Sequence, residues 1–423
     1  MKYIFIPNNY SKISDWIKYI ENIHYKEMDF RLDAIYHIAS NLGLLQPAPI
    51  AIIVGGTNGK GSTCRLIEAI LLNSKKTVGV YSSPHLLKYN ERIRVQGLPI
   101  SNEICILAIS YINKIRGKIS ISYFEFSTLV ALWIFKYLKL DVVILEVGLG
   151  GSLDATNIVN SNISVITNVA LEHTQILGGT YDQIAKEKSG IFRSGKIAIF
   201  GDVKNSFKLR YAAQIHKAIP YFCNIHWFWK KYSTFWMWKD QKCTINLPYP
   251  NLSVKNAATA LAVIQSLPYF ISYQSIIQGL KTTLIGRFQI INKKPLIILD
   301  VAHNPHAASF LSKKMKKIKK NINFLYAIVG MLRDKDIKNT LKYFLNIIDV
   351  WYCVSLLEYP RGAKNEELSV HLCEKKSRIE KFENVKSAWE QAIKKVKKND
   401  CILVFGSFYT ISSILNRKIN KKL

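Results

Sequence analysis

Apolar and polar positions along the first half of the chain alternate with two different periods. Short, continuous apolar runs rich in β-branched residues are separated by segments in which apolar residues recur at helical spacing. Such runs are typical of strands covered on both faces, because the connecting helices bury a parallel sheet. The runs cover residues 50–54, 77–83, 141–147, 163–169 and 196–200. The pattern predicts an α/β fold with a mostly parallel sheet.

The pattern changes twice beyond residue 200. Residues 221–250 are rich in aromatic side chains and alternate over short distances, which indicates added antiparallel strands, and a helix is expected over residues 254–265. After residue 287 the alternation of strand-like and helical segments restarts, with strand-like runs within 295–303, 322–330, 350–356 and 401–407. We therefore predict two domains, residues 1–287 and a smaller, Rossmann-like α/β domain of residues 288–423.

The composition is that of a globular protein. The chain has 423 residues, 49% of them hydrophobic, and a mean hydropathy of +0.05. No apolar run reaches bilayer length, and the apolar start, residues 3–6, is too short for the core of a signal peptide. The seven cysteines are scattered and never form C-x-x-C, so they indicate neither a disulfide framework nor a zinc site. We expect a cytoplasmic protein without membrane contact.

The formal net charge of +30 raises the question of an acidic partner. The densest basic cluster, residues 313–320, places Met315 and Ile318 at helical spacing among lysines, which is typical of an amphipathic helix with a solvated face. The basic clusters lack interleaved aromatic residues and match no nucleic-acid-binding motif. We therefore expect no nucleic-acid partner and attribute the charge to compositional drift toward lysine.

A glycine-rich turn joins the apolar run that ends at Val54 to a segment of helical spacing. Glycines let a backbone approach an anion closely, the following helix directs its amide groups at that anion, and Lys60 adds a positive charge. The turn departs from the usual P-loop spacing, because Val54 stands at the first glycine position and Gly61 separates Lys60 from Ser62. The pattern predicts a variant phosphate-binding loop, and the alternative is a glycine-rich turn with a solvated lysine.

Polar residues where apolar runs stop are the next candidates, because ligands bind at the carboxyl ends of parallel strands. Glu146 ends one run, where its carboxylate is suited to a hard cation near Ser62. His173 follows the next run. A carboxylate bonded to loop amides and a structural histidine are the alternatives, since neutral imidazole is an unusual ligand for Mg²⁺.

Three further candidates are ambiguous from pattern alone. Lys188 lies near a predicted helix end, where a lysine is normally a solvated charge that complements the helix dipole. Asp300 and His303 follow an apolar run and precede a helix that begins with proline, a position suited to a second site wall. Arg287 precedes them near the predicted boundary, where a nucleotide contact and a structural ion pair are both open.

Seven segments, in order and spanning nearly the whole chain, closely resemble the folylpolyglutamate synthase/dihydrofolate synthase family of the Mur-ligase superfamily. They read VGGTNGKGSTCRL, VYSSPHLLKYNERIRVQG, EVGLGGSLDATN, KEKSGIFR, KNAATAL, GRFQI and LDVAHNPHAA. The resemblance implies an ATP-dependent ligase that adds L-glutamate to dihydropteroate and to reduced folates through an acyl phosphate. It also implies a P-loop-type ATPase and pterin-binding domain over residues 1–287 and a glutamate-ligase domain over residues 288–423.

The resemblance assigns roles to individual residues. It implies that two Mg²⁺ ions are held by Ser62, Ser83, Glu146 and His173, and that Lys60, His173 and Lys188 are catalytic, with Lys188 carbamylated. The positions implied for ATP are Thr57, Asn58, Gly59, Lys60, Asn256, Arg287 and Asp300. The positions implied for the pterin substrate are Asp29, Phe30, Arg31, Ser122, Tyr123, Phe124, Glu125, Leu153, Asp154 and Ala155. Domain closure near Arg287 would exclude water from the reaction.

Four positions depart from the family pattern. Arg31 stands where a glycine is usual, Ser152 replaces an arginine, and acidic positions around His173 carry Glu172 and Gln175 in place of aspartates. We expect the ATP chemistry to be retained, and the four departures leave the pterin affinity open. The alternatives are a cell-wall Mur ligase, a decayed ATP- or folate-binding protein, and a ligase that keeps only one of the two activities. We expect a monomer whose partners are small molecules.

Overall fold

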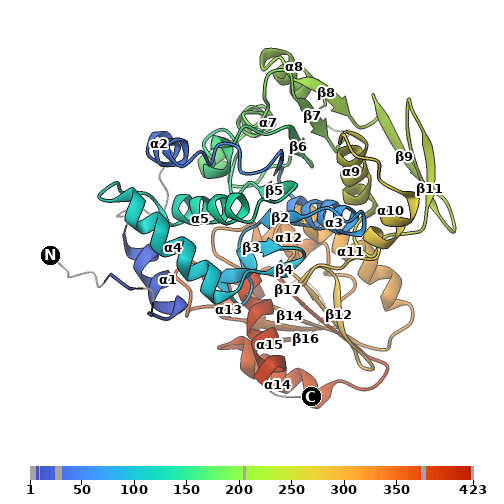
Figure 1. Cartoon of the computed structure of the whole chain (residues 1–423). Coiled ribbons are helices and arrows are strands. Elements are labelled where there is room, and N and C mark those ends of the chain that lie inside the picture. The colour runs from blue at the N-terminus through green and yellow to red at the C-terminus, as the bar shows by residue number, and fades with distance from the viewer. Residues whose placement is uncertain (1–5, 9, 24–30, 203–205, 373–377, 421–423) are drawn as a thin grey trace. The chain divides into compact units, whose positions relative to one another are not determined.

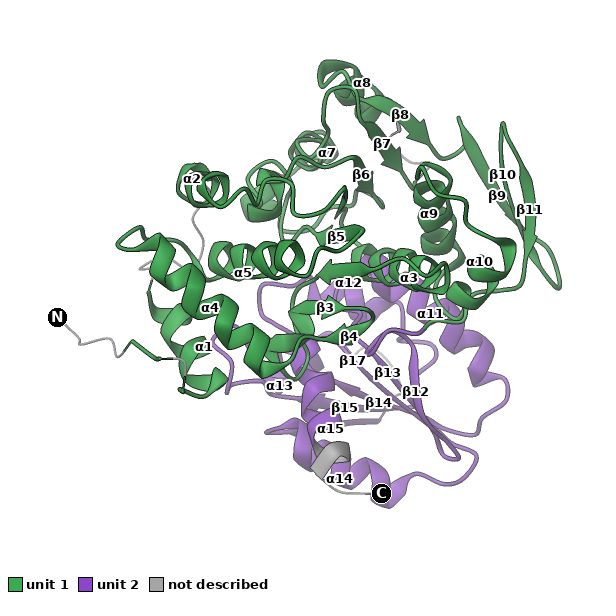
Figure 2. Cartoon of the chain, in the orientation of Figure 1, with its two compact units in different colours: residues 1–282 green, residues 283–423 purple. Residues whose placement is uncertain are grey.

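The computed structural model describes residues 6–8, 10–23, 31–202, 206–372 and 378–420. They form two compact units, Met1–Thr282 and Thr283–Leu423 (Figure 2). The pattern of the sequence predicts the division after Arg287 instead. Among the described residues, the helices are all too short or too polar to cross a bilayer.

The main sheet of unit 1 has eight strands in the order β4-β3-β2-β5-β1-β6-β7-β8 (Figure 1). Their bounds are β1 Ile50–Gly55, β2 Val78–Tyr81, β3 Ile93–Val95, β4 Leu98–Pro99, β5 Val142–Glu146, β6 Ile163–Ile166, β7 Ile197–Phe200 and β8 Ile219–Phe222. Within the described residues of this sheet, the pairs β2–β3 and β3–β4 are antiparallel, and the other pairs are parallel. All five predicted runs are strands of this sheet, so the predicted mostly parallel sheet is confirmed.

Helices cover both faces of this sheet (Figure 1). They are α1 Ile13–Asn22, α2 Asp33–Asn41, α3 Lys60–Asn73, α4 Asn102–Arg116, α5 Tyr123–Tyr137, α6 Thr174–Leu177, α7 Tyr181–Ser189, α8 Ser206–Ile215, α9 Val254–Gln265 and α10 Tyr273–Leu280, with the 3₁₀ turns η1 Tyr89–Arg92 and η2 Ala155–Ile158. In β1, Ala51 and Ile53 share a core with residues of α1, α4 and α5. Ile52 and Val54, equally buried, point to the other face, because successive side chains alternate along a strand.

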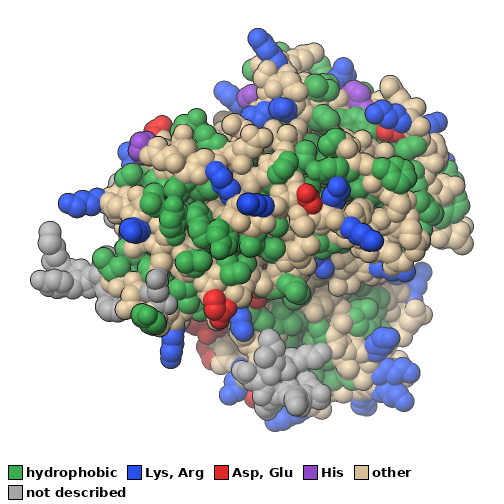
Figure 3. Space-filling model, viewed as in Figure 1, with side chains coloured by type: hydrophobic (Ala, Val, Ile, Leu, Met, Phe, Trp, Pro, Cys, Tyr) green, Lys and Arg blue, Asp and Glu red, His purple; other side chains and the backbone are tan. Residues whose placement is uncertain are grey.

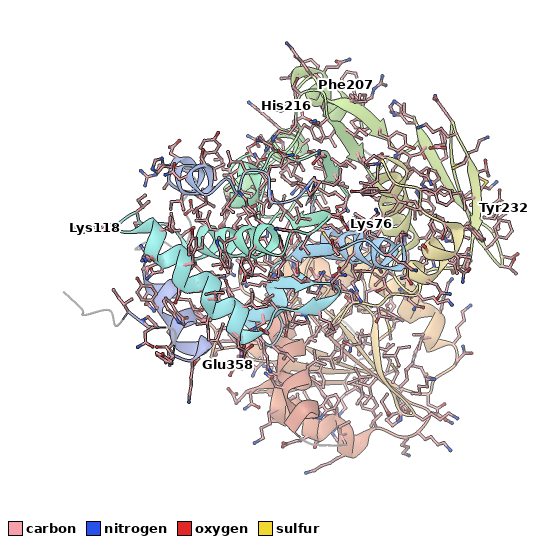
Figure 4. The ribbon with its side chains drawn as sticks, viewed as in Figure 1. Lys76, Lys118, Phe207, His216, Tyr232 and Glu358 are labelled. Carbon is pink, nitrogen blue, oxygen red and sulfur yellow. The ribbon has the colours of Figure 1, made fainter. Side chains whose placement is uncertain are left out.

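A second, antiparallel sheet of unit 1 contains β9 Trp227–Lys231, β10 Trp236–Asp240 and β11 Thr244–Leu247. It confirms the antiparallel strands predicted from the aromatic stretch. The Trp238 indole donates to Ala258 O at 3.1 Å and so anchors the sheet on α9. Tyr232, at the edge of this sheet, stacks on Phe235 with 4.7 Å between ring centroids (Figure 4).

Unit 2 has a six-stranded sheet in the order β12-β13-β17-β14-β15-β16. Its elements are β12 Gln289–Lys293, β13 Leu296–Asp300, α11 Pro305–Lys319, β14 Leu325–Val329, α12 Ile337–Lys342, β15 Val350–Val354, α13 Asn365–Ser369, β16 Arg378–Phe382, α14 Val385–Lys395, β17 Cys401–Phe405 and α15 Phe408–Asn420. The four predicted runs form β13, β14, β15 and β17, which pair in parallel. The pattern missed β12 and β16, because edge strands are partly exposed and carry polar side chains.

The lysine-rich cluster of unit 2 lies in α11, as predicted. Met315 is fully buried there, whereas Lys313, Lys314, Lys316 and Lys317 are exposed. On the visible face of the molecule, lysine and arginine side chains are spread out and do not gather into one stripe (Figure 3). The expectation of no nucleic-acid partner stays a prediction.

Candidate functional site

The phosphate-binding loop connects β1 to α3 through two residues in the left-handed region. Gly59, the N-cap of α3, has φ 87°, and Gly56 has φ 129°. A Cβ atom on Gly56 would lie only 2.0 Å from Thr167 Oγ1. Glycine is required at both positions, since an L side chain there would be strained and, at Gly56, would also collide. The backbone thus turns directly into the positive end of α3.

Residues 167–170, which follow β6, hold this loop in place through hydrogen bonds. Thr57 Oγ1 accepts a hydrogen bond from Ala170 N at 3.0 Å, and Asn168 Oδ1 accepts one from Asn58 N at 3.1 Å. Asn58 O accepts two more, from Thr167 Oγ1 at 2.7 Å and Asn168 Nδ2 at 2.6 Å. The loop is therefore preorganised by residues that the sequence analysis missed. Their only signal is their place at the end of the strand beside β1.

Lys60 begins α3 and folds back over the loop. Its Nζ donates to Gly56 O at 3.0 Å and to Thr57 O at 3.5 Å. The ammonium group thus lies where the loop curves, as a phosphate-binding lysine requires.

Oxygen donors gather at the carboxyl ends of β2 and β5, next to the loop. Glu146, at the end of β5, is 6% exposed, and its Oε2 would be 3.3 Å from a Cβ on Gly61. Ser62 lies in the first turn of α3, and Ser83 follows β2, the strand paired with β5. Across the described residues, no three His, Cys, Asp or Glu side chains gather as a metal-binding group. One carboxylate with hydroxyl groups suits Mg²⁺, which is usually bound by few protein ligands together with substrate phosphates.

A cavity lies beside the loop within unit 1. It is lined by Gly56, Thr57, Lys60, Val147, Gly148, Leu149, Gly150, Glu172, His173, Leu177 and Lys188. His173 is the N-cap of α6 and has φ 53°, a left-handed conformation that is uncommon for a non-glycine residue. The structure therefore brings three predicted catalytic residues, Lys60, His173 and Lys188, to one cavity.

Lys188 is buried at the end of α7 and only 4% exposed. Burial, followed by the nearby charge of Lys60, lowers the pKa of its amine to about 7, although Glu172 and Glu187 act in the opposite direction. The carboxylates of Glu172, Glu187 and Asp154 act on this amine, but burial has the largest effect. A large share of this lysine is thus uncharged near neutral pH.

The alternative that Lys188 is a solvated charge at a helix end does not fit the structure, because a loop that follows β5 covers the end of α7. Ser152 N and Ser152 Oγ both donate to Glu187 O at 2.9 Å. Gly151 N donates to Glu187 Oε1 at 3.2 Å. Ser152, the residue that departs from the family's arginine, therefore helps to bury Lys188.

Asn256 on α9 lies against the phosphate loop. Its Oδ1 would be 2.6 Å from a Cβ on Gly59, so this glycine also leaves room for the Asn256 amide. Of the predicted ATP contacts outside the loop, Asn256 is the one that unit 1 places beside it.

The two other predicted ATP contacts lie in unit 2. Asp300, at the end of β13, accepts from Phe288 N at 2.8 Å and from Ala302 N at 2.9 Å. Burial raises the pKa of Asp300, while the guanidinium of Arg287 opposes the shift. Arg287 and Asp300 are therefore close enough to interact electrostatically, as the sequence analysis considered.

The ring of Phe408 contacts both Arg287 and His303 in unit 2. The Arg287 guanidinium carbon lies 5.6 Å from the centroid of the Phe408 ring, a cation–π distance. The ring of His303 packs on the same phenylalanine at 6.4 Å, and its Nδ1 lies 2.8 Å from Val301 O. The cluster presents a cation, a carboxylate and an imidazole on neighbouring loops.

The predicted pterin residues serve local structure as well. Asp29 and Phe30 lie outside the described residues, and Arg31 is exposed. Ser122 and Glu125 form a capping box at the start of α5, in which Glu125 Oε2 accepts from Ser122 N and Ser122 Oγ, both at 2.7 Å. A capping box satisfies helix-end amide groups that would otherwise be unpaired. Both side chains thus have a structural role whatever they bind.

Phe124 and Asp154 shape the loop that follows β5. The Phe124 ring packs on Tyr81 and would lie 2.7 Å from a Cβ on Gly148. Asp154 is buried and accepts four hydrogen bonds from backbone amides and a hydroxyl, including Gly148 N at 2.9 Å. Leu153 beside it is 46% exposed, and Ala155 is buried. Leu153 is therefore the member of this segment whose side chain is free to meet a ligand.

Two other departures from the family pattern lie near His173. Glu172 lines the cavity and raises the pKa of Lys188 through its charge. Gln175 is exposed on α6. Glu172 therefore keeps a carboxylate at the cavity, whereas nothing in the structure explains Gln175.

The sequence analysis missed a buried arginine. Arg92 is 8% exposed, its Nε donates to His85 Nδ1 at 2.9 Å, and its guanidinium lies 5.2 Å from the Tyr123 ring centroid. Burial lowers the pKa of His85 to about 4, and the Arg92 charge adds to the shift, so this imidazole is neutral and accepts. The only signal in the sequence was its place in a motif that the family shares.

The chain is similar to known proteins over nearly its whole length. Residues 286–408 match the family model described as Mur ligase, glutamate ligase domain. The chain is 44% identical over 411 residues to the dihydrofolate synthase/folylpolyglutamate synthase of Escherichia coli (strain K12), covering 97% of this chain and 96% of that protein. The protein of the same name from Haemophilus influenzae is 43% identical and is covered to 96%, over 95% of this chain.

Solved structures give the same result. E. coli FolC in complex with DHPP and ADP superposes with a TM-score of 0.95 at 43% identity, covering 99% of this chain and 100% of that one. The Yersinia pestis bifunctional folylpolyglutamate synthase/dihydrofolate synthase complexed with AMPPNP and Mn ion gives 0.92 at 43% identity, covering 98% and 99%. The chain belongs to the dihydrofolate synthase/folylpolyglutamate synthase family.

Proposed function

We propose that this protein is an ATP-dependent ligase that joins L-glutamate to dihydropteroate and to the glutamate tail of reduced folates. One observation carries the proposal: a fastened phosphate loop and a buried lysine of low pKa line the same cavity. Relatives support the substrate classes, since one structure contains DHPP with ADP and another contains Mn, AMPPNP and L-glutamate. The cell-wall and decayed alternatives find no support in these relatives.

The chemistry begins with a carboxylate, which is a poor acylating agent. Transfer of the terminal phosphoryl group of ATP to the substrate carboxylate gives an acyl phosphate and ADP. The amino group of glutamate attacks the acyl carbon, the amide bond forms, and inorganic phosphate leaves. The protein's share is positioning and charge compensation. In this proposal Lys60 and the amide groups of Thr57, Asn58 and Gly59 hold the phosphates, and Asn256, Arg287 and Asp300 contact the rest of the nucleotide.

The oxygen donors at the loop fit magnesium. We propose that Ser62, Ser83, Glu146 and His173 hold two Mg²⁺ ions, which would offset negative charge on the phosphates. Glu146 is buried beside Gly61 at the start of α3, so its carboxylate is already directed at the loop. His173 lines the cavity beside this loop.

Lys188 is proposed to be carbamylated. A neutral amine adds to CO₂ to give a carbamate, one proton is released, and a cation is replaced by an anionic oxygen group. The lowered pKa of Lys188 supports this reaction, because only the uncharged amine is nucleophilic. The anionic oxygen of the carbamate would be a hard ligand suited to a metal ion.

The pterin substrate is proposed to lie near the segments at the start of α5 and after β5. Tyr123, Phe124 and Leu153 supply apolar surface, while Asp154 and the capping box of Ser122 and Glu125 hold the backbone in place. The segment of Asp29, Phe30 and Arg31 is assigned to the same substrate, and Ala155 completes the set.

We further propose a cytoplasmic monomer. The six described cysteines are all free thiols, which fits a reducing compartment.

The test is glutamate-dependent ADP formation by the purified protein with ATP and Mg²⁺. We expect ADP release with dihydropteroate, and separately with a reduced folate, only when L-glutamate is present. ADP release with just one acceptor would show a single activity. No glutamate-dependent release with either acceptor would refute the proposed function.

A further inference from the structure

We propose that Glu68 and Arg94 are positioning residues that hold the loop of Ser82 and Ser83 against α3. This inference rests on the proposed function, because it concerns the place of Ser83 among the oxygen donors for the metal. It concerns two residues to which the resemblance assigns no role.

Glu68 is a fully buried carboxylate on α3, two turns beyond Lys60. Two arginines converge on it. Arg94 approaches with Nε at 3.3 Å from each carboxylate oxygen and with NH2 at 3.1 Å from Oε2, which is a forked contact. Arg65 donates from NH1 to Oε2 at 2.9 Å. The carboxylate is thus neutralised by two guanidinium groups within hydrogen-bonding distance.

Arg94 extends this contact to the loop after β2. Its NH1 donates to Ser82 Oγ at 3.1 Å, although Ser82 and Arg94 are 12 residues apart. Arg94 lies on β3 opposite Val80 of β2, and Ser82 N donates to Arg92 O at 2.8 Å. One guanidinium therefore connects α3, β3 and the residue that immediately precedes Ser83.

Helix α3 carries both the proposed metal donor Ser62 and the proposed positioning residue Glu68. Ser62 lies in the first turn of α3, and Glu68 lies on the same helix. Gly61, the residue before Ser62, lies against Glu146, whose Oε2 would be 3.3 Å from a Cβ on Gly61, so the helix that carries Glu68 also contacts the donor at Glu146.

Fold stability alone is a weak reason for this arrangement. A buried ion pair often adds little net stability over apolar residues of similar volume, because both charges lose their hydration. A rigid forked contact does fix distances, and groups behind metal ligands commonly act in this way. The Arg94 side chain is 13% exposed, so water has little access to the contact. We infer that the pair sets the separation of Ser83 from Ser62.

The test compares Arg94→Met with Arg65→Met, since both arginines donate to Glu68 and Arg94 also donates to Ser82. Mn²⁺ binding in the presence of AMPPNP is measured by isothermal titration, and the Mg²⁺ concentration for half-maximal ADP formation is measured in parallel. We expect Arg94→Met to weaken Mn²⁺ binding about tenfold and to raise the Mg²⁺ requirement similarly. Arg65→Met should leave both values near wild type.

Two milder variants keep the test decisive if Arg94→Met does not fold. Arg94→Lys and Ser82→Ala should each give part of the loss of Mn²⁺ affinity while retaining a wild-type melting temperature. Unchanged Mn²⁺ affinity in a folded Arg94 variant, or equal losses for the Arg65 and Arg94 variants, would overturn the inference. Failure of the wild type to make ADP would refute the proposed function instead, and Mn²⁺ titration would still test the positioning role.

Discussion

Two lysines line the same cavity of unit 1, and the protein surrounds them differently. Lys60 lies among carbonyl oxygens and donates to Gly56 O at 3.0 Å. Lys188 is 4% exposed, and burial lowers the pKa of its amine to about 7 although nearby carboxylates oppose the shift. Carbonyl oxygens suit a cation, whereas burial favours the neutral amine. One cavity thus offers a positive charge and a nucleophilic nitrogen, which is the combination that the proposed ligase requires.

The largest effect is expected from Lys60→Met. Removing the only lysine of the phosphate loop should lower kcat for glutamate-dependent ADP formation about 10³-fold, since it removes a charge that stabilises the transferring phosphoryl group. Steady-state kinetics measures the change. Lys186→Met, an exposed position on α7, is the control and should be near wild type. A loss below about tenfold would show that Lys60 does not have this role.

Lys188→Met should have the next largest effect, a loss of about 10²-fold in kcat, because a proposed metal-oriented ligand is removed. Added acetate should restore part of the activity, since a small carboxylate can supply the missing anionic oxygen. Lys186→Met again serves as the control, and it should not respond to acetate. Full activity in the Lys188 variant would remove the distinction between the two lysines.

The pH dependence of carbamylation sharpens the comparison. A lysine with a pKa of about 7 is uncharged above that pH and protonated below it, so CO₂ addition should slow as the pH falls. At a fixed dissolved CO₂ concentration, enzyme first stripped of CO₂ should regain activity about tenfold faster at pH 8 than at pH 6. The initial rate of recovery measures this ratio. Equal recovery rates at the two pH values would contradict the lowered pKa.

The smallest effect is expected from a variant that leaves both lysines in place. Ser122→Ala removes the capping box of α5 and should lower the free energy of unfolding by about 1 kcal/mol. Ser101→Ala, at the N-cap of α4, is the matched control for stability. Urea unfolding gives both values, and KM for dihydropteroate is measured alongside. If Ser122→Ala raised that KM no more than Ser101→Ala, the α5 start would be structural only.

The sequence predicted those parts of the site that are contiguous in the chain. The turn over residues 55–62 was recognisable because its glycines, lysine and following helix are neighbours. The residues that fasten it were not recognisable, since Thr167 and Asn58 are 109 residues apart. The strands of unit 2 show the same limit: β16 carries a polar edge sequence that resembles a loop.

The burial of Lys188 could not be predicted from its own segment. The pattern places it near the end of a helix, where lysines are commonly solvated. Its burial depends on Ser152, whose hydroxyl group donates a hydrogen bond to Glu187 O although the two residues are 35 positions apart in the sequence. Long-range packing of this kind, and not local propensity, decides the charge state of the lysine.

The most direct test of the central claim is an isotope transfer. Dihydropteroate labelled with ¹⁸O in its carboxylate is incubated with the protein, ATP, Mg²⁺ and L-glutamate, and the released inorganic phosphate is analysed by mass spectrometry. An acyl phosphate requires one labelled oxygen to leave with each phosphate as the amide forms. We predict that labelled phosphate forms in step with ADP. Phosphate without label, alongside amide product, would contradict activation of the carboxylate by ATP.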